Sequence, residues 1–436
     1  MRQNDIWGSR LGFYLVAIGS ACGLGNLWRF PFVVSENGGG AFVLIYIFAA
    51  FAIGSPLLIQ ELILGKRKQK PLVSAIETSI PGLVSTLLSL VVLSYYSILS
   101  GWVLRLLFEI VQSSGEMQQV ELSGGRQFLF SALHVCLAIY VVSRGIRSGL
   151  EKWMKFIMPS FAVLMIFLVS KSVNLEATGD AVKYLFYPDF NKLKMGSLNH
   201  AIGHVLFTLS LGFGSMVTFG KYLSKDIRVP VAGFRIAFID TVVSLFAVLL
   251  IFPIALSASN IPLTDPALMF KVLPRFILNL PGGVVWAVIF FLSLYFATLS
   301  ATIGLFENVI SNLSAIFKDH IRRIWVCVLS GFLVVLLGSF PMVLGYLISG
   351  YDLSVNSNLI EQVDSLMINW LLPLATLFVL YFSRKTLGLQ LVEHEFIQGS
   401  EVQPSLFFPY WKFLIEWIAP GLILLGLGMQ IFGLFI

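Results

Sequence analysis

Long apolar segments separated by short polar loops fill most of the 436-residue chain. An α-helix needs about 17–25 apolar residues to cross a bilayer, and these segments have that length or slightly more. Lipid offers the backbone no hydrogen-bond partner, so the segments must be helical. The pattern predicts an all-α integral membrane protein whose eleven transmembrane helices lie near residues 11–34, 40–64, 84–111, 127–143, 150–171, 197–220, 232–256, 284–312, 324–340, 360–382 and 408–433.

The composition supports a membrane protein and excludes other classes. Apolar residues make up 57% of the chain, charged residues only 12%, and the mean hydropathy is +0.87, whereas a soluble domain has about 25% charged residues. The net charge of +6 lies in short loops between apolar segments, so we expect the lipid bilayer as a partner and no nucleic acid. Cys22, Cys136 and Cys327 all lie inside apolar segments and form no disulfide framework. The polar stretch from Met1 to Arg10 lacks the pattern of a cleavable signal peptide.

Basic residues fall in alternate loops and therefore on one side of the predicted bundle. Positive residues mark the cytoplasmic face, so the N-terminus is predicted to be cytoplasmic and, with eleven spans, the C-terminus extracytoplasmic. The residues that carry this prediction are Arg2, Arg10, Lys66, Arg67, Lys68, Lys70, Arg144, Arg147, Lys152, Lys155, Lys221, Lys225, Arg228, Lys318, Arg322, Arg323, Arg384 and Lys385.

The first apolar segment contains residues that an ordinary membrane helix avoids. Gly19, Gly23 and Gly25 fall within seven residues, followed by Asn26, Arg29 and Pro31. Each glycine costs a helix about 1 kcal/mol relative to alanine, and proline removes a donor. A helix that breaks at this depth exposes backbone groups that must face protein, water, an ion or a ligand. The pattern favours a binding site made of backbone; close helix packing is the alternative use of such glycines.

The sixth segment repeats this anomaly. Residues 207–214 place two hydroxyls and two glycines at the centre of an apolar helix. Spans 1 and 6 are the first members of two five-span halves, and an odd number of spans inverts the second half. Paired broken helices in corresponding positions point to a transporter site at an inverted-repeat interface. We therefore divide the chain into residues 1–171 (spans 1–5), 197–385 (spans 6–10) and 408–436 (an additional span 11).

The sequence resembles the neurotransmitter:sodium symporter family, in the bacterial branch that includes the leucine transporter. The resemblance covers spans 1–10 and implies the family's fold in its eleven-span form, located in the bacterial inner membrane. The matching residues are Trp7, Arg10–Gly12, Gly19–Pro31, Glu36–Phe42, Pro56, Glu61, Tyr95, Tyr96, Trp102, Phe207–Gly214, Gly149 and Pro159.

The resemblance implies a site for a zwitterionic amino acid. Helix N-terminal amides suit its carboxylate, and unpaired carbonyls at a helix C-terminus suit its ammonium or a sodium ion. Tyr96 is expected to hydrogen-bond the substrate carboxylate. The implied substrate-binding residues are Ala21, Leu24, Gly25, Val92, Tyr96, Phe207, Thr208, Ser210, Phe213, Ala301 and Leu305. The apolar lining predicts a neutral, hydrophobic or aromatic amino acid.

Two sodium sites are implied, and no organic cofactor. The first uses Ala21, Asn26, Thr208 and Asp240, together with the substrate carboxylate, which couples ion to solute. The second uses Gly19, Cys22, Ala297 and Ser300. The family usually has two adjacent hydroxyl residues in span 8, whereas this chain has Ala301 after Ser300. Thr302 points about 100° further round the helix, so one or two ions remain open.

Asp240 predicts chloride independence, because chloride-independent members of the family carry a carboxylate where chloride-coupled members bind the anion. It is the only acid in the stretch Phe238–Ser244. The alternative is that Asp240 lies at the cytoplasmic end of span 7 and is simply exposed to water.

Other intramembrane charges also have implied roles. Arg29 and Asp364 match the family's outer gate pair, and Glu61 is expected to support the broken backbone of spans 1 and 6. The inner gate pair is missing, since Asn4 and Ala315 occupy the expected positions, with Arg2 or Arg10 as substitutes.

Three functions compete for this sequence: an enzyme, a symporter, and a sensor or scaffold. The five histidines form no metal-ligand spacing and no nucleophile with a base is visible, so an enzyme is excluded. A sodium-coupled symporter working by alternating access explains the paired broken helices. An amino-acid sensor or scaffold with a transport fold is the alternative, given Ala301 and the missing inner gate. The chain has no Gly-x4-Gly-Lys-Ser/Thr motif, so ion gradients supply the energy. The oligomeric state stays open.

Overall fold

The computed structural model describes residues 6–112, 125–257, 270, 273–318, 320–349, 357–397 and 404–433, and these contain helices and no strand. Among them, nine helices are long and apolar enough to span a membrane, and the pair formed by residues 10–21 and 25–36, bent by 44°, makes a tenth. The sixth predicted span is also broken, into α10 (Ser197–Thr208) and α11 (Ser215–Lys221).

The elements of the first half follow the predicted spans closely. The first span is α1 (Arg10–Ala21), a π-turn η2 (Gly25–Arg29) and α2 (Phe30–Glu36). The remaining elements are α3 (Gly40–Ala49), η3 (Ala50–Gly54), α4 (Ser55–Lys68), α5 (Leu72–Ala75), α6 (Ile80–Gln112), α7 (Gly125–Ser143), η4 (Ile146–Glu151), α8 (Lys152–Ser172), α9 (Thr178–Phe186) and η5 (Phe190–Lys192).

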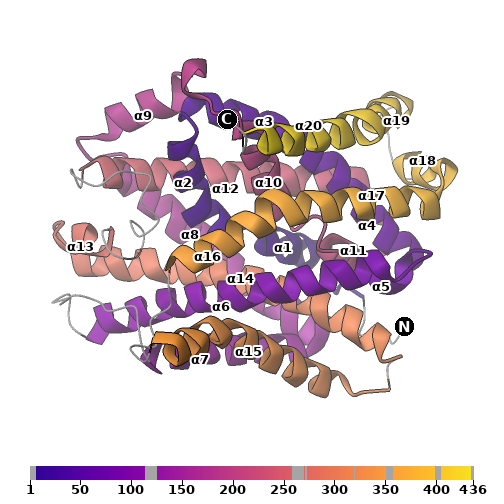
Figure 1. Ribbon diagram of the computed structural model, residues 1–436, viewed down its shortest axis with the longest axis horizontal. Coiled ribbons are helices and arrows are strands. Elements are labelled where there is room, and N and C mark those ends of the chain that lie inside the picture. Colours follow the sequence, from indigo (N-terminus) through magenta and orange to yellow (C-terminus); the bar gives the residue numbers. More distant parts are fainter. Residues whose placement is uncertain are drawn as a thin grey trace.

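The second half and the last span complete the helical bundle. After α10 and α11 come α12 (Val229–Ser257), α13 (Leu273–Leu278), α14 (Gly283–Ile316), α15 (Arg323–Ser349), α16 (Ser357–Leu366), η7 (Met367–Leu371), α17 (Leu372–Leu387), α18 (Leu389–Ile397), α19 (Pro404–Phe413), η8 (Leu414–Ile418) and α20 (Ala419–Phe432). The long helices α6, α12, α14 and α17 run roughly in one direction across Figure 1, as helices that span the same bilayer do.

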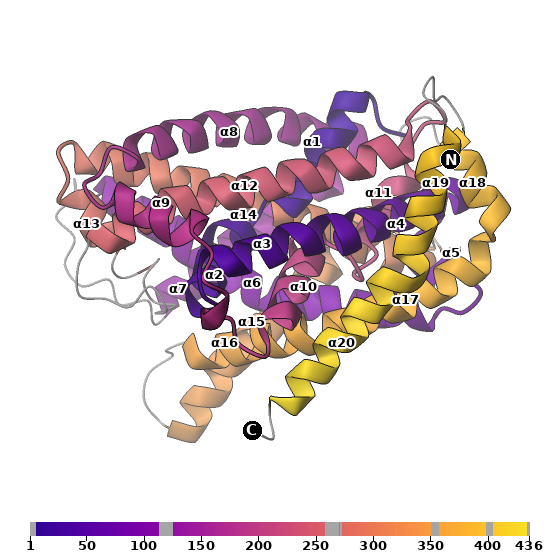
Figure 2. The same cartoon turned by 90° about the horizontal axis from the view of Figure 1, so that it is seen from above.

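Basic residues and their acidic partners gather at one end of the bundle. In both views α5 and α18 lie at one end, and α9 and α13 at the other (Figures 1 and 2). Lys66 and Arg67, at the end of α4, form ion pairs with Glu395 of α18, and Lys385 pairs with Glu77 beside α5. We call this the basic end; it is the end that the sequence predicts to be cytoplasmic.

Candidate functional site

The first span breaks at Cys22–Leu24. The helix α1 ends at Ala21, and Cys22 leaves helical geometry with φ −80° and ψ 85°. The amide of Gly23 donates to the carbonyl of Ala21 at 3.0 Å and lies 3.2 Å from Asn26 Oδ1. Two acceptor oxygens therefore share the Gly23 amide. Pro31 lies in the first turn of α2, where a backbone N–H has no helical partner, so its missing N–H does not weaken the helix. The helix is unwound where the glycines predicted it.

The sixth span breaks between Thr208 and Ser215. Gly212 and Gly214 have φ values of 75° and 81°, which glycine adopts without strain, and Ser210 has φ 53°. The hydroxyl of Ser210 contacts Ser20, whose carbonyl oxygen lies at 3.2 Å, so the two breaks lie side by side. Ser210 is one of the predicted substrate-binding residues, and its hydroxyl contacts the first span at this position.

Glu61 supports only the sixth-span break among the described residues. Its Oε1 accepts a hydrogen bond from the Gly212 amide at 2.8 Å, and the side chain is buried. The prediction that it supports the backbone of both broken spans is therefore too broad. Spans 1 and 6 are joined instead by the Ser20–Ser210 contacts.

A buried carboxylate joins the two broken spans to span 7. Asp240 is 1% exposed. Its Oδ1 accepts from Asn26 Nδ2 at 2.7 Å and its Oδ2 from Thr208 Oγ1 at 3.0 Å. Asn26 Nδ2 also reaches Ser244 Oγ at 2.8 Å. The alternative of an aspartate that meets water at the end of span 7 is wrong. Asn26, Thr208 and Asp240 therefore meet where spans 1, 6 and 7 approach one another. Carboxylate, hydroxyl and amide groups supply the oxygens that a hard cation needs. Ala21 is buried at the end of α1.

The predicted substrate-binding residues cluster on both sides of the first break. The Leu24 amide donates to Tyr96 Oη at 2.8 Å. A Cβ on Gly23 would lie 2.5 Å from Tyr96 Oη and 2.9 Å from Ala301 Cβ, so α6 and α14 approach the same backbone.

Aromatic side chains lie on the other side of this backbone. A Cβ on Gly25 would lie 3.1 Å from the Phe207 ring and 3.0 Å from Thr208 Cγ2. The rings of Phe207 and Phe213 meet edge to face at 6.4 Å. Val92 and Leu305 are buried in the same core. The structure therefore gathers apolar groups around the unwound segment.

The residues predicted for the second sodium ion are buried, two of them at or near the end of α1 and two in α14. A Cβ on Gly304 of α14 would lie 2.4 Å from Ser20 Oγ, which shows how closely these helices pack. Ser300 Oγ donates to Ala297 O at 2.9 Å. Gly19 packs against the methionines of α8, and Cys22, Ala297 and Ser300 are fully buried.

Thr302 does not replace the missing hydroxyl at Ala301. Its Oγ1 donates to Thr298 O at 2.8 Å and lies 3.0 Å from His134 Nε2 of α7. The hydroxyl therefore faces span 4.

A buried ion pair lies on the far side of the breaks from the basic end. Arg29 Nε and Asp364 Oδ2 are 2.9 Å apart, and both side chains are largely buried. Tyr95 Oη donates to the other carboxylate oxygen at 2.9 Å. His204, stacked on Phe30 with 4.8 Å between ring centroids, has Nδ1 3.5 Å from Arg29 Nη1.

At the basic end the segment before α1 crosses α11. Trp7 Nε1 donates to Phe219 O at 3.1 Å. Arg10 Nη2 pairs with Asp226 Oδ2 of the loop before α12 at 2.8 Å. Of the residues considered for an inner gate, Arg2 and Asn4 lie outside the described part of the chain, and Ala315 is half-buried near the end of α14. Arg10 thus has an acidic partner that the sequence did not identify.

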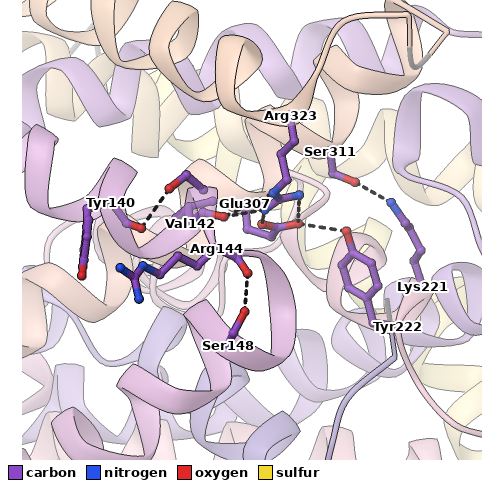
Figure 3. A network of polar contacts seen from close by, with 10 residues as sticks. Tyr140, Val142, Arg144, Ser148, Lys221, Tyr222, Glu307, Ser311 and Arg323 are labelled. Atoms are coloured by element: carbon purple, nitrogen blue, oxygen red, sulfur yellow. Dashed lines mark hydrogen bonds and ion pairs between the residues drawn. The ribbon is translucent and has the colours of Figure 1, made fainter. Parts of the chain in front are cut away.

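A second polar network at the basic end was missed. Figure 3 shows Glu307 between Arg323 and Tyr222. Glu307 is fully buried, accepts from Tyr222 Oη at 2.9 Å and pairs with Arg323. Arg323 Nη2 also donates to Val142 O at 2.9 Å. This network ties spans 4, 8 and 9 to the end of span 6. An acid inside an apolar segment was the signal that could have identified Glu307.

Comparisons with known proteins agree with this geometry. A family model described as the sodium:neurotransmitter symporter family matches residues 4–123 and 111–431. The chain is 31% identical over 438 residues to YhdH of Bacillus subtilis, described as an uncharacterized sodium-dependent transporter, with 95% of each chain covered. An uncharacterized sodium-dependent transporter of Haemophilus influenzae is 27% identical over 450 residues, with 97% of each covered. A crystal structure of MhsT in complex with L-phenylalanine matches with a TM-score of 0.86 and 30% identity, over 97% of this chain and 99% of that one.

Two broken helices with their unwound segments side by side in a membrane-spanning bundle define a secondary transporter. The chain belongs to the sodium:neurotransmitter symporter family. It is a sodium-dependent transporter and not an enzyme, and the predicted fold class is confirmed. Among the described residues, no group of three or more His, Cys, Asp or Glu could hold a metal ion.

Proposed function

We propose that the chain imports a neutral, hydrophobic or aromatic amino acid together with one or two sodium ions, by alternating access and without chloride. The observation that carries this proposal is the cluster of Asn26, Thr208 and Asp240 at the two breaks. This cluster places a carboxylate and further oxygen atoms beside the unwound backbone, where a sodium ion and a substrate carboxylate can share ligands.

The tyrosine at the first break supports a carboxylate-bearing substrate. Tyr96 Oη accepts a hydrogen bond from the Leu24 amide at 2.8 Å. Its own proton remains free to donate to another acceptor, because a phenol both accepts and donates. A substrate carboxylate beside Leu24 and Gly25 would take that proton and the nearby amides.

The lining supports a neutral, apolar side chain. Val92, Phe207, Phe213 and Leu305 carry no charge that could pair with an acidic or basic substrate. MhsT, of the same fold, has been crystallised with L-phenylalanine. Phe207 is half-buried and meets Phe213 edge to face, an arrangement that can also receive an aromatic ring.

One strong and one weak sodium site fit the side chains. Asp240 supplies a full negative charge to the first site, and two unit charges about 4 Å apart interact by about 4 kcal/mol at an effective dielectric of 20. The second site has Ser300 as its one predicted side-chain ligand, since Thr302 bonds within span 8 and to His134. The Asp240 charge also makes a chloride ion unnecessary there.

The conformation supports a transporter over a sensor. The Arg29–Asp364 pair lies on one side of the breaks, and the Arg10–Asp226 and Glu307–Arg323 pairs lie on the other. A protein that alternates between two openings needs ties that can form and break on both sides.

With the basic end cytoplasmic in a bacterial inner membrane, the N-terminus is cytoplasmic and the C-terminus extracytoplasmic. Residues 1–171 and 197–385 are the two inverted halves.

The test combines binding with exchange. A thermal-shift screen of amino acids with and without sodium identifies the ligand, because a ligand of the folded state raises stability by mass action. Counterflow of that labelled amino acid in proteoliposomes then separates a transporter from a sensor. Sodium-dependent binding without counterflow would overturn the proposal in favour of the sensor.

A further inference from the structure

A basic cavity at the outside of the bundle has no role in the transport site. It has a volume of about 710 Å³ and lies between the start of α1, the end of α4, the loop before α12, the first turns of α12, and α18. Five basic and two acidic residues line it. Ligand sites in proteins commonly have about 300–1,000 Å³, so the cavity can hold a sizeable polar group.

Both carboxylates of the cavity are already paired. Asp226 pairs with Arg10 at 2.8 Å. Glu395, which is buried, pairs with Lys66 at 2.9 Å and with Arg67 at 2.6 Å. Lys66 Nζ also donates to the carbonyl oxygen of Ile227 at 3.0 Å, which fixes the loop that forms the cavity wall.

The three remaining cations of the cavity, Lys225, Arg228 and Arg235, have no ion pair within the part of the chain that the structure describes. All three are exposed. Arg235 makes a long cation–π approach to Tyr14, another residue of the cavity wall, with 6.0 Å between Arg235 Cζ and the ring centroid. The cavity therefore carries an excess of positive charge without a matching acid.

Arg235 lies on the lipid-facing surface of α12. Val231, Phe234 and Phe238 on the same face are 41%, 53% and 52% exposed, as expected for side chains that face acyl chains. An arginine side chain on such a surface extends along the helix, so that its guanidinium group reaches the polar interface of the membrane. The cavity thus joins the hydrocarbon boundary, at Arg235, to the aqueous loop, at Lys225.

We propose that this cavity binds the phosphate group of an anionic phospholipid from the leaflet at the basic end. Guanidinium groups bind phosphate oxygens through paired, charge-assisted hydrogen bonds. Basic pockets between membrane helices on the cytoplasmic side are suited to anionic headgroups. Inorganic phosphate has the same chemistry, but it needs no contact with the acyl-facing residues around Arg235. The lipid therefore fits the position of the cavity better.

The test uses the purified full chain in detergent, with short-chain phosphatidylglycerol as the probe. Thermal unfolding is measured as the probe is titrated, and native mass spectrometry counts the bound lipid. We expect a saturable stabilisation by phosphatidylglycerol and none by phosphatidylcholine or inorganic phosphate. Arg228→Gln with Arg235→Gln should weaken phosphatidylglycerol binding by roughly tenfold or more, since each cation near an anionic headgroup contributes about 1 kcal/mol.

The matched control is Lys152→Gln with Arg322→Gln, which removes the same charge from two exposed residues outside the cavity. Equal weakening in both double variants would overturn the proposal, because net charge alone would then explain the binding. Saturable stabilisation by inorganic phosphate would overturn the lipid assignment. If the Arg228/Arg235 variant does not fold, Lys225→Gln in the loop replaces it and should weaken binding severalfold; unchanged binding there would also contradict the site.

Discussion

Arg29 and Asp364, 335 residues apart in sequence, form a buried ion pair with 2.9 Å between Nε and Oδ2. Tyr95 of α6 donates to the same carboxylate at 2.9 Å. Asp364 therefore joins the outer half of the first broken span to α16 and α6. This ion pair holds the three helices together beside the unwound segments. It can do so only while both partners are present.

The first prediction concerns this pair. Asp364→Ala leaves the Arg29 guanidinium buried without its carboxylate, and loss of one partner of a buried pair costs about 3–5 kcal/mol. Because neither residue is among those predicted to bind the substrate, we expect exchange to slow far more than sodium-dependent binding weakens. Counterflow and equilibrium binding on the same preparation measure the two effects.

Tyr95→Phe is the matched control, since it removes one hydrogen bond to Asp364 and keeps the ion pair. It should slow exchange much less than Asp364→Ala does. Equal loss of binding and exchange in Asp364→Ala would place this residue outside the gate.

A second prediction follows from the crowding at Gly23. Alanine there would put a Cβ 2.5 Å from Tyr96 Oη, so Tyr96 or the unwound backbone must move. We expect Gly23→Ala to lower the melting temperature and the affinity for the amino acid. The cost in stability should shrink in a Tyr96→Phe background, with a coupling of about 0.5–3 kcal/mol in a double-mutant cycle.

Gly428→Ala on α20 is the control, because nothing lies within 4 Å of its added Cβ. In a helix with free space, alanine should be neutral or stabilise by up to about 1 kcal/mol. Identical costs of Gly23→Ala in the tyrosine and phenylalanine backgrounds would show that the Tyr96 hydroxyl is not the obstacle.

The third prediction concerns the number of ions. With Ala301 in place of a hydroxyl residue, uptake titrated against sodium should show a Hill coefficient of about one if a single ion is coupled. Ala301→Ser should raise the apparent affinity for sodium. Thr302→Val, which removes a hydroxyl that faces His134, should leave that affinity unchanged. An Ala301→Ser variant with wild-type sodium dependence would contradict this interpretation.

The fourth prediction separates two roles of Glu61. Its Oε1 accepts from the Gly212 amide at 2.8 Å in a buried setting. Glu61→Ala leaves that amide without a partner, at a cost of about 1–3 kcal/mol. Glu61→Gln keeps an acceptor oxygen and should retain most of the melting temperature. A glutamine variant as unstable as the alanine variant would show that the charge, and not the hydrogen bond, is what the fold requires.

The breaks in the helices could be predicted from sequence because they depend on local chemistry. Gly212 and Gly214 occupy left-handed backbone positions, and Pro31 opens α2. Such residues are rare within membrane helices, so their clusters at 19–31 and 207–214 revealed both unwound segments. The resemblance then supplied partners from distant spans, including Asp240 and Asp364, which no local pattern contains.

The ties at the basic end could not be predicted in the same way. Arg10 meets Asp226, and Glu307 meets Arg323, only after the helices pack. Each pair joins different elements, and a single sequence holds many basic residues near each acid. The contact between the Ser210 hydroxyl and Ser20 depends on packing in the same way, since it joins two spans.

The last prediction concerns Asp240 and chloride. Its carboxyl group accepts from Asn26 and Thr208 at 2.7 and 3.0 Å, with 1% of the residue exposed, so it is held beside both breaks. Wild-type uptake should be unaffected when gluconate replaces all chloride. Asp240→Asn keeps the shape and removes the charge, so this variant should be inactive or stimulated by chloride, which would supply the missing negative charge. Asp226→Asn, an exposed aspartate changed in the same way, should show no chloride dependence. A wild type that needs chloride, or an Asp240→Asn variant with normal uptake in gluconate, would contradict the role of this carboxylate.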